Sequence, residues 1–145
     1  MRIDVVTLFP ELVEHAARFG VTGRALERGL WRLATWNPRD FTTDNYRTVD
    51  DRPYGGGPGM VLKAEPLRLA MLEAARRVPA ARRIYLAADG APVTQCRVAG
   101  LAGMAELVLV AGRYEGVDER FVQAYTDESL SIGDVTVDEA AGTMT

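Results

Sequence analysis

The sequence contains one cysteine, Cys96, one histidine, His15, and no apolar run long enough to cross a membrane. A lone cysteine cannot form an internal disulfide, and a lone histidine beside it argues against a zinc site or any other metal centre of that kind. A membrane span needs about 20 consecutive apolar residues, and the N-terminus lacks the pattern of a signal peptide. These absences predict a cytoplasmic protein in a reducing compartment, with no membrane partner. Cys96 itself lies in a helical pattern and is interpreted as a small packing residue.

Lysine is also scarce, because every basic residue except Lys63 is an arginine. The net charge of −3 is unevenly divided, with +2 over residues 1–80 and −5 over residues 81–145. Six arginines lie between Arg24 and Arg52. Guanidinium groups match phosphates and base edges in a way that ammonium groups do not. The basic segment therefore indicates either nucleic-acid contacts or ordinary solvated helix faces, and charge alone leaves both open.

Glycine and proline are concentrated in one place. Four glycines and two prolines fall within Pro53–Met60, a density that excludes a helix or a central strand. Such a loop lets the backbone approach a ligand closely, and the acidic and arginine side chains of residues 47–52 precede it. Neither a Walker loop nor a Gly-x-Gly-x-x-Gly motif is present. The two interpretations are a ligand-binding loop and a flexible surface linker.

The first half of the chain predicts a strand over residues 3–8, a helix from Pro10 to Gly20, a short helix capped by Thr22 and a strand over residues 31–36. The first of these helices has an apolar side formed by Leu12, Val13, Ala16 and Phe19. Residues 40–59 have little regular pattern, and a loop of that length in a compact domain is usually functional or disordered.

The second half alternates between helices and strands. It first predicts a helix after Pro66 with Leu67, Ala70, Met71 and Ala74 inward, and then a strand over residues 84–87 followed by a turn over residues 88–92. The next elements are a helix capped by Thr94, with Val98, Leu101, Ala102 and Ala105 inward, and a buried strand over residues 107–111. The last are a helix with Val117, Phe121 and Tyr125 on one stripe and a short strand or turn over residues 130–134. This alternation predicts a single α/β domain, a parallel sheet flanked by helices. Ligands of such sheets bind at the carboxyl ends of the strands, so the loops after Ala87, Ala111 and Ile132 are candidate binding loops.

Four segments carry a specific resemblance: residues 37–41, residues 47–60, residues 112–120 and residues 131–134. In this order and spacing they resemble bacterial tRNA (guanine-N1)-methyltransferases. The resemblance implies a knotted α/β fold of the SPOUT class with a trefoil knot in its C-terminal part, over a single domain of residues 1–145, and a homodimer. It also implies S-adenosylmethionine as methyl donor, Mg2+ as an additional candidate cofactor, and tRNA as partner, methylated at N1 of the guanine just 3′ of the anticodon.

The resemblance also assigns site residues. The donor pocket is implied at Tyr85, Leu86, Ala87, Gly112, Tyr114, Glu115, Gly116, Ile132, Gly133, Asp134 and Val135. The tRNA contacts are implied at Asp50, Arg52, Gly55, Gly56, Gly57 and Gly59. Arg113 and Glu115 are expected in supporting catalytic roles, because an acid favours the sulfonium donor and an arginine can stabilise negative charge on guanine O6.

The pattern departs from the family in two places, at residues 87–90 and after Asp134. The family's general base, an arginine partner and the C-terminal tRNA-binding domain are expected beyond Thr145, so no general base is assigned within the chain. Weak donor binding and very slow methyl transfer are the corresponding expectations. Two alternatives to the enzyme remain: a catalytically inactive cofactor-binding, RNA-binding or dimerisation module, and an unrelated α/β nucleotide-binding domain.

Overall fold

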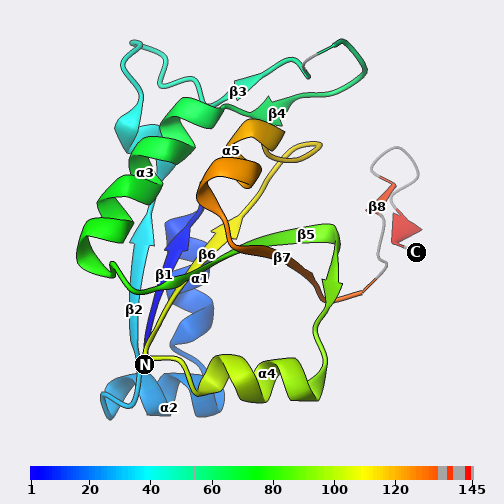
Figure 1. Ribbon diagram of the computed structural model, residues 1–145. Coiled ribbons are helices and arrows are strands. Elements are labelled where there is room, and N and C mark those ends of the chain that lie inside the picture. Colours follow the sequence, from blue (N-terminus) through cyan, green and yellow to red (C-terminus); the bar gives the residue numbers. More distant parts are fainter. Residues whose placement is uncertain (54, 134–136, 139–142, 145) are drawn as a thin grey trace.

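Five parallel strands form the central sheet of the computed structural model, which describes residues 1–53, 55–133, 137–138 and 143–144 (Figure 1). Their order across the sheet is β2-β1-β6-β5-β7. Their bounds are Arg2–Val6 for β1, Arg32–Trp36 for β2, Arg82–Pro92 for β5, Glu106–Ala111 for β6 and Glu128–Ser131 for β7. The predicted parallel α/β sheet is therefore confirmed, and all five strands place their carboxyl ends at one edge.

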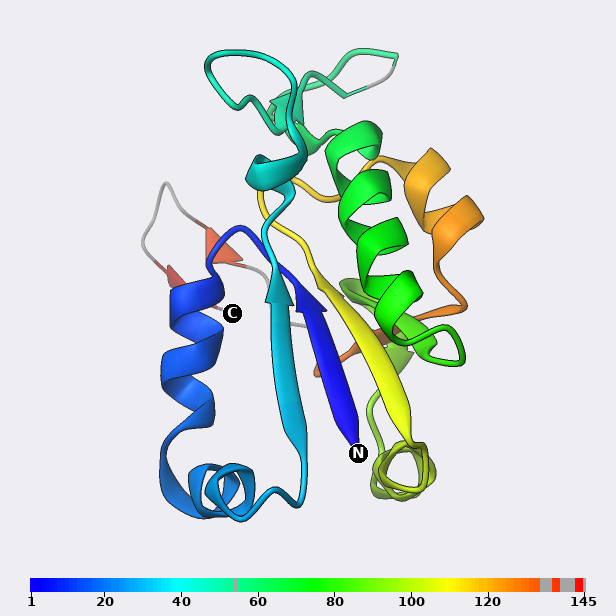
Figure 2. The same cartoon turned by 90° about the vertical axis from the view of Figure 1, so that its left-hand side faces the viewer.

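Helices lie on both faces of this sheet (Figure 2). Helices α3 (Ala64–Arg77) and α5 (Glu119–Tyr125) cover one face, while α1 (Pro10–Ala17) and α2 (Gly20–Glu27) lie on the other. Helix α4 (Gln95–Ala102) runs below the amino ends of the strands in Figure 1. The main core lies under α3 and α5, and its members include Val6, Leu67, Met71, Val108, Val110 and Phe121. The predicted inward residues of α3 are all buried, as expected.

The face that carries α1 and α2 is packed much less. Its core cluster contains three buried residues, Ile84, Leu107 and Leu130. Helices α1 and α2 bury one residue each, and the apolar side predicted for the first helix largely faces solvent. Leu12, Phe19 and Val21 are 68%, 61% and 79% exposed.

Several short elements complete the described fold. They are the 3-10 helix η1 (Pro38–Phe41), an antiparallel pair β3 (Asp50–Asp51) and β4 (Val61–Leu62), and a second antiparallel pair β8 (Val137–Asp138) and β9 (Thr143–Met144). The β3–β4 pair stands above the sheet, so the segment predicted to be irregular is anchored at the edge where ligands are expected.

Besides the apolar side of the first helix, other predictions about elements were wrong. Thr22 is not an N-cap, because Gly20 with a φ of +62° turns the chain and α2 begins there. Helix α4 is capped by Thr94 as predicted, but it buries none of its residues, and Cys96 is exposed rather than packed. Residues 88–92 do not form a turn after a strand that ends at Ala87; they belong to β5.

The extension of β5 has a definite cause. Leu86 and Ala91 both pair with Leu130 of β7, so residues 87–90 form a bulge and the strand resumes beyond it. A Cβ atom on Gly90 would lie 2.6 Å from the carbonyl carbon of Leu130. The absence of a side chain at Gly90 is what lets the bulge press against β7.

Candidate active site

The loop after β6 packs against the end of β5. A Cβ atom on Gly112 would lie 3.3 Å from both the Tyr85 ring and a Val117 methyl group, and one on Gly116 would lie 3.7 Å from the Tyr85 hydroxyl. Burial raises the pKa of the Tyr85 phenol, and a hydrogen bond with the Val117 backbone offsets part of this rise. The structure thus brings Tyr85, Gly112 and Gly116 together, three of the residues predicted for the donor pocket.

The glycine-rich loop docks on the same segment. The Glu115 N–H donates to the Met60 carbonyl over 2.9 Å, and the Leu62 N–H donates to the Gly116 carbonyl over 2.9 Å. A Cβ atom on Gly59 would lie 2.2 Å from Glu115 Cγ, so only glycine leaves room for this carboxylate side chain. The loop predicted to meet RNA and the loop predicted to meet the donor are therefore in direct contact.

A cavity of about 560 Å³ lies at this contact. It is lined by Gly59, Met60, Gly112, Arg113, Tyr114 and Glu115. Tyr114 adopts a φ of +62°, which a residue with a side chain rarely does, and such strain is often found at functional sites. The cavity offers one acid, one guanidinium and a partly exposed aromatic ring on a backbone with two glycines.

The third predicted loop lines a separate hollow. Leu86, Ala87, Ile132 and Gly133 border a cavity of about 310 Å³, together with Ala88, Val93, Leu130 and Ser131. Ile132 is 94% exposed in the part of the chain that the structure describes. Asp134 and Val135, the last two residues predicted for the donor pocket, lie outside the described residues, as does part of the segment in which the knot was expected.

The predicted tRNA contacts do not all lie in the same place. Gly59 reaches the cavity, whereas Gly55, Gly56 and Gly57 have positive φ angles and nothing within 4 Å of a Cβ position, so they project from the edge. Asp50 is held in β3 opposite Leu62.

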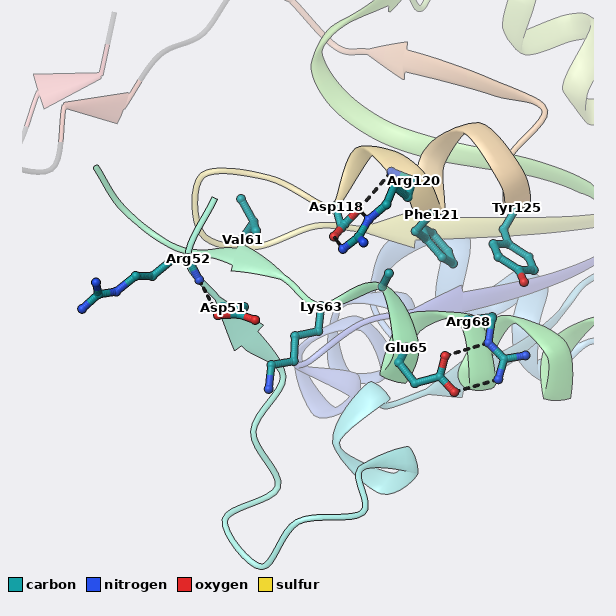
Figure 3. Close-up of a pocket in the computed structure, with 11 residues that line it drawn as sticks. Asp51, Arg52, Val61, Lys63, Glu65, Arg68, Asp118, Arg120, Phe121 and Tyr125 are labelled. Atoms are coloured by element: carbon teal, nitrogen blue, oxygen red, sulfur yellow. Dashed lines mark hydrogen bonds and ion pairs between the residues drawn. The ribbon is translucent and has the colours of Figure 1, made fainter. Parts of the chain in front are cut away.

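Arg52 borders a different cavity of about 520 Å³, shown in Figure 3. Its other lining residues are Asp51, Val61, Lys63, Ala64, Glu65, Arg68, Asp118, Arg120, Phe121 and Tyr125. Two arginine–carboxylate pairs stand in its wall, Arg68 with Glu65 at 2.7 Å and Arg120 with Asp118 at 2.6 Å. This cavity combines paired charges with apolar side chains such as Val61 and Phe121.

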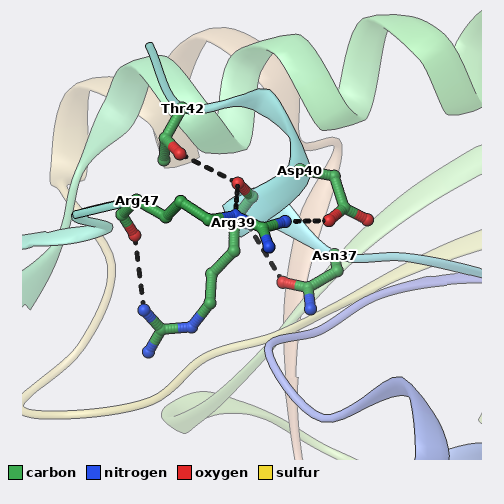
Figure 4. Close-up of polar contacts among 5 residues, drawn as sticks. All are labelled: Asn37, Arg39, Asp40, Thr42 and Arg47. Atoms are coloured by element: carbon green, nitrogen blue, oxygen red, sulfur yellow. Dashed lines mark hydrogen bonds and ion pairs between the residues drawn. The ribbon is translucent and has the colours of Figure 1, made fainter. Parts of the chain in front are cut away.

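The sequence did not reveal the order of the loop that precedes β3. Asn37 caps η1 by accepting the Arg39 N–H over 3.0 Å, and Arg39 and Arg47 each donate a side-chain N–H to the other's carbonyl (Figure 4). Arg47 also pairs with Asp40. The signal that could have predicted this ordered loop is the asparagine directly before a proline, a pattern typical of helix starts. These arginines are thus partly used to hold their own loop.

A second contact that the sequence did not reveal joins Arg113 to Phe9, whose ring centroid lies 5.4 Å from the guanidinium carbon. Within the described residues, no group of three or more histidine, cysteine or acidic side chains that could hold a metal ion gathers. No helix in the described part of the chain is long and apolar enough to cross a membrane.

Comparison with known proteins places this arrangement in a family. Residues 1–143 match the family model described as tRNA (Guanine-1)-methyltransferase TrmD, and the chain belongs to this family. Curated relatives named tRNA (guanine-N(1)-)-methyltransferase include one from Methylococcus capsulatus, 58% identical over 135 residues, and one from Pseudomonas putida, 53% identical over 135 residues. Both alignments cover 92% of this chain and 54% of the relative. The chain therefore spans about half the length of these relatives.

The fold agrees with a solved structure. The tRNA (m1G37) methyltransferase from Aquifex aeolicus superposes with a TM-score of 0.83 at 32% sequence identity, over 92% of this chain and 60% of that one. The resemblance inferred from four sequence segments is thereby confirmed, as is the likeness of the chain to enzymes that methylate tRNA.

Proposed function

We propose that this chain is the donor-binding, catalytic part of a tRNA (guanine-N1)-methyltransferase that acts on the guanine just 3′ of the anticodon. The contact between the glycine-rich loop and the Gly112–Asp118 loop carries the proposal. Methyl transfer requires donor and acceptor sites to adjoin, and these loops are the predicted RNA-contacting and donor-binding segments. The relative from Aquifex aeolicus is described as an m1G37 enzyme, which supports the choice of guanine.

The residues at the carboxyl edge fit S-adenosylmethionine. Gly112 and Gly116 leave space beside Tyr85 that side chains would fill, and Glu115 supplies a negative charge next to it. Bound there, S-adenosylmethionine would supply an electrophilic methyl group on a sulfonium cation. The proposed donor pocket comprises Tyr85, Leu86, Ala87, Gly112, Tyr114, Glu115, Gly116, Ile132, Gly133, Asp134 and Val135. No residue of this chain is assigned to the candidate cofactor Mg2+.

The RNA side of the site is proposed at the β3–β4 hairpin. Asp50 and Arg52 precede the projecting glycines 55–57. These glycines let the RNA backbone come close without side-chain interference. The Arg113 guanidinium is placed to stabilise negative charge that develops on O6 when the N1 proton leaves. The general base is not assigned to any residue of this chain.

We further propose that two copies associate through the face that carries α1 and α2. Several large apolar side chains of this face are exposed, among them Leu12, Phe19, Val21 and Leu30. Exposed apolar side chains collected on one face are typical of an interface. A trefoil knot of the SPOUT class and a location in the cytoplasm belong to the same proposal, because they accompany the family resemblance.

Equilibrium dialysis against labelled S-adenosylmethionine and ATP tests the donor, and a tritiated-methyl assay tests the acceptor. We expect weak retention of S-adenosylmethionine alone, and slow transfer of label to tRNA with guanine 3′ of the anticodon but not to the same tRNA with adenine there. Equal retention of ATP would contradict the proposed donor. Retention without any transfer would instead identify a non-catalytic binding module.

A further inference from the structure

The contact between Arg113 and Phe9 follows from the sheet register. Val6 of β1 pairs with Val110 of β6. Phe9 lies three residues after Val6, and Arg113 lies three residues after Val110. Parallel neighbouring strands therefore deliver an aromatic ring and a guanidinium to the same place at the carboxyl edge. Their separation of 5.4 Å is within the range of an attractive cation–π interaction.

Phe9 is held in place by its backbone. Its N–H donates to the Thr7 hydroxyl over 3.1 Å, and its carbonyl accepts the Leu12 N–H over 3.2 Å at the start of α1. Thr7 is only 5% exposed, and its backbone N–H donates a hydrogen bond to the Trp36 carbonyl of the neighbouring strand. The Phe9 ring is nevertheless 46% exposed, so a rigid backbone presents an open aromatic face.

Arg113 depends on this ring for its position. Among the residues that the structure describes, no carboxylate or carbonyl pairs with its guanidinium, and the Phe9 ring is its recorded contact. An arginine whose face lies on a ring keeps its N–H groups available at the edge of the guanidinium plane. Arg113 also lines the cavity that contains Gly59 and Glu115.

We propose that Phe9 is a positioning residue that holds the Arg113 guanidinium at this cavity to receive an oxyanion of the bound substrates. The inference rests on the proposed function, which supplies two oxyanions of the same chemistry, the donor carboxylate and the developing charge on guanine O6. A guanidinium that is already restrained loses less conformational entropy when it binds an anion. Phe9 thereby strengthens the interaction without touching the ligand.

The first measurement asks whether Phe9 positions Arg113, and it needs no ligand. The NMR signal of the Arg113 side-chain Nε–H should be displaced by the aromatic ring in the unaltered protein and in Phe9→Tyr, and should lose that displacement in Phe9→Leu. Leu72→Ala is the control, because Leu72 is similarly exposed, at 42%, but lies on α3 on the opposite face. An unchanged Arg113 signal in Phe9→Leu overturns the inference.

The second measurement asks whether the contact serves the substrates. Phe9→Leu should weaken donor binding or slow transfer at saturating donor by about two- to fivefold, the range that exposed cation–π contacts support. Phe9→Tyr should restore the value, and Leu72→Ala should leave it unchanged. A larger dissociation constant for the donor assigns the oxyanion to the donor carboxylate. Slower transfer with an unchanged dissociation constant assigns it to guanine O6.

A double-mutant cycle separates positioning from a general structural effect. In an Arg113→Gln background, Phe9→Leu should have no further effect, because the group that Phe9 positions is gone. If Phe9→Leu has the same effect in that background, or has no effect in a protein that binds the donor, this inference is overturned while the proposed function stands. If the unaltered protein binds neither donor nor RNA, the proposed function and the substrate role fail together, and the NMR signal still reports the contact.

Discussion

A single missing side chain decides how the two central loops meet. Gly59 has a φ of +83°, and a Cβ atom there would overlap the Glu115 side chain. The nearby Gly57 has a φ of +125° but open space around it. Position 59 thus combines a backbone requirement with a packing requirement, whereas position 57 has only the first.

Gly59→Ala should destabilise the protein by more than the roughly 1–2 kcal/mol of a strained left-handed residue. It should also shift the Glu115 amide signal in an NMR spectrum, since the carboxylate side chain must move. Gly57→Ala is the control and should show the strain without the displaced Glu115. Equal urea-unfolding midpoints and equal Glu115 signals in the two variants would contradict this reading.

Asp118 makes stability depend on pH. Hydrogen bonding from the Arg120 side chain holds the pKa of the Asp118 carboxyl below its ordinary value. A depressed pKa means that the ionised form stabilises the folded state above the unfolded pKa of about 3.9, and that this contribution disappears as pH falls through the folded pKa. Asp118 also caps α5 by accepting the Arg120 N–H over 2.9 Å.

Asp118→Asn keeps an acceptor for the cap but removes the charge. Because Arg120 is 77% exposed, we expect a loss of only about 0.2–1 kcal/mol at pH 7. The difference from the unaltered protein should shrink in urea-unfolding experiments as pH falls through the folded pKa of Asp118, since both proteins then carry a neutral group. Glu119→Gln on the same helix is the control, and a difference that persists at low pH would count against the ion pair.

Among the elements, β5 shows most clearly what sequence could and could not predict. The apolar run of residues 84–87 predicted its first part, and the following Ala-Asp-Gly-Ala-Pro run has the composition of a turn. The strand resumes because β7 offers pairing partners to Ala91 and Pro92. Nothing local to β5 reports that partner, so the extension is a tertiary effect.

Gly90→Ala should disrupt this bulge. The added methyl group would lie 2.6–2.8 Å from backbone atoms of Ser129 and Leu130, which cannot rotate away as a side chain can. We expect a loss of about 1–3 kcal/mol and faster hydrogen exchange of the Val93 N–H, which donates to Ser131. Gly100→Ala in α4 has free space and should instead stabilise by up to about 1 kcal/mol. The same sign of effect at both positions would refute the close approach at Gly90.

Helix α4 illustrates a second limit of sequence reasoning. Its cap was predicted correctly because Thr94 acts locally, accepting the Arg97 N–H over 3.2 Å. Its apolar residues were assigned to the interior because the pattern marks a stripe without saying what covers it, and Val98 remains 43% exposed. The candidate site follows the same rule: the loops were predicted individually, whereas the Gly59–Glu115 and Phe9–Arg113 contacts depend on strand order.

At the scale of the whole molecule, the two faces of the sheet differ in how completely they are covered. The α3 and α5 side holds the large core cluster, and the α1 and α2 side leaves several large apolar side chains in solvent. A second copy of the chain would cover the latter face and remove that apolar area from water.

Leu12→Glu should therefore weaken self-association in sedimentation equilibrium while leaving the thermal midpoint at high dilution nearly unchanged, because Leu12 is 68% exposed. Leu72→Glu is the matched control, since Leu72 is 42% exposed on α3, on the opposite face. Dissociation by the control, or none by Leu12→Glu in a protein that is dimeric, would exclude this face as the interface.

The position of β1 between β2 and β6 has a consequence for biosynthesis. This strand leaves the ribosome before both of its neighbours, and one of them, β6, begins only at Glu106. At about 5–20 residues per second, translation of the intervening segment takes on the order of 5–20 s. During that interval β1 can pair with β2 alone and keeps one open edge, which makes the nascent chain a candidate client for chaperones that shield unpaired strands.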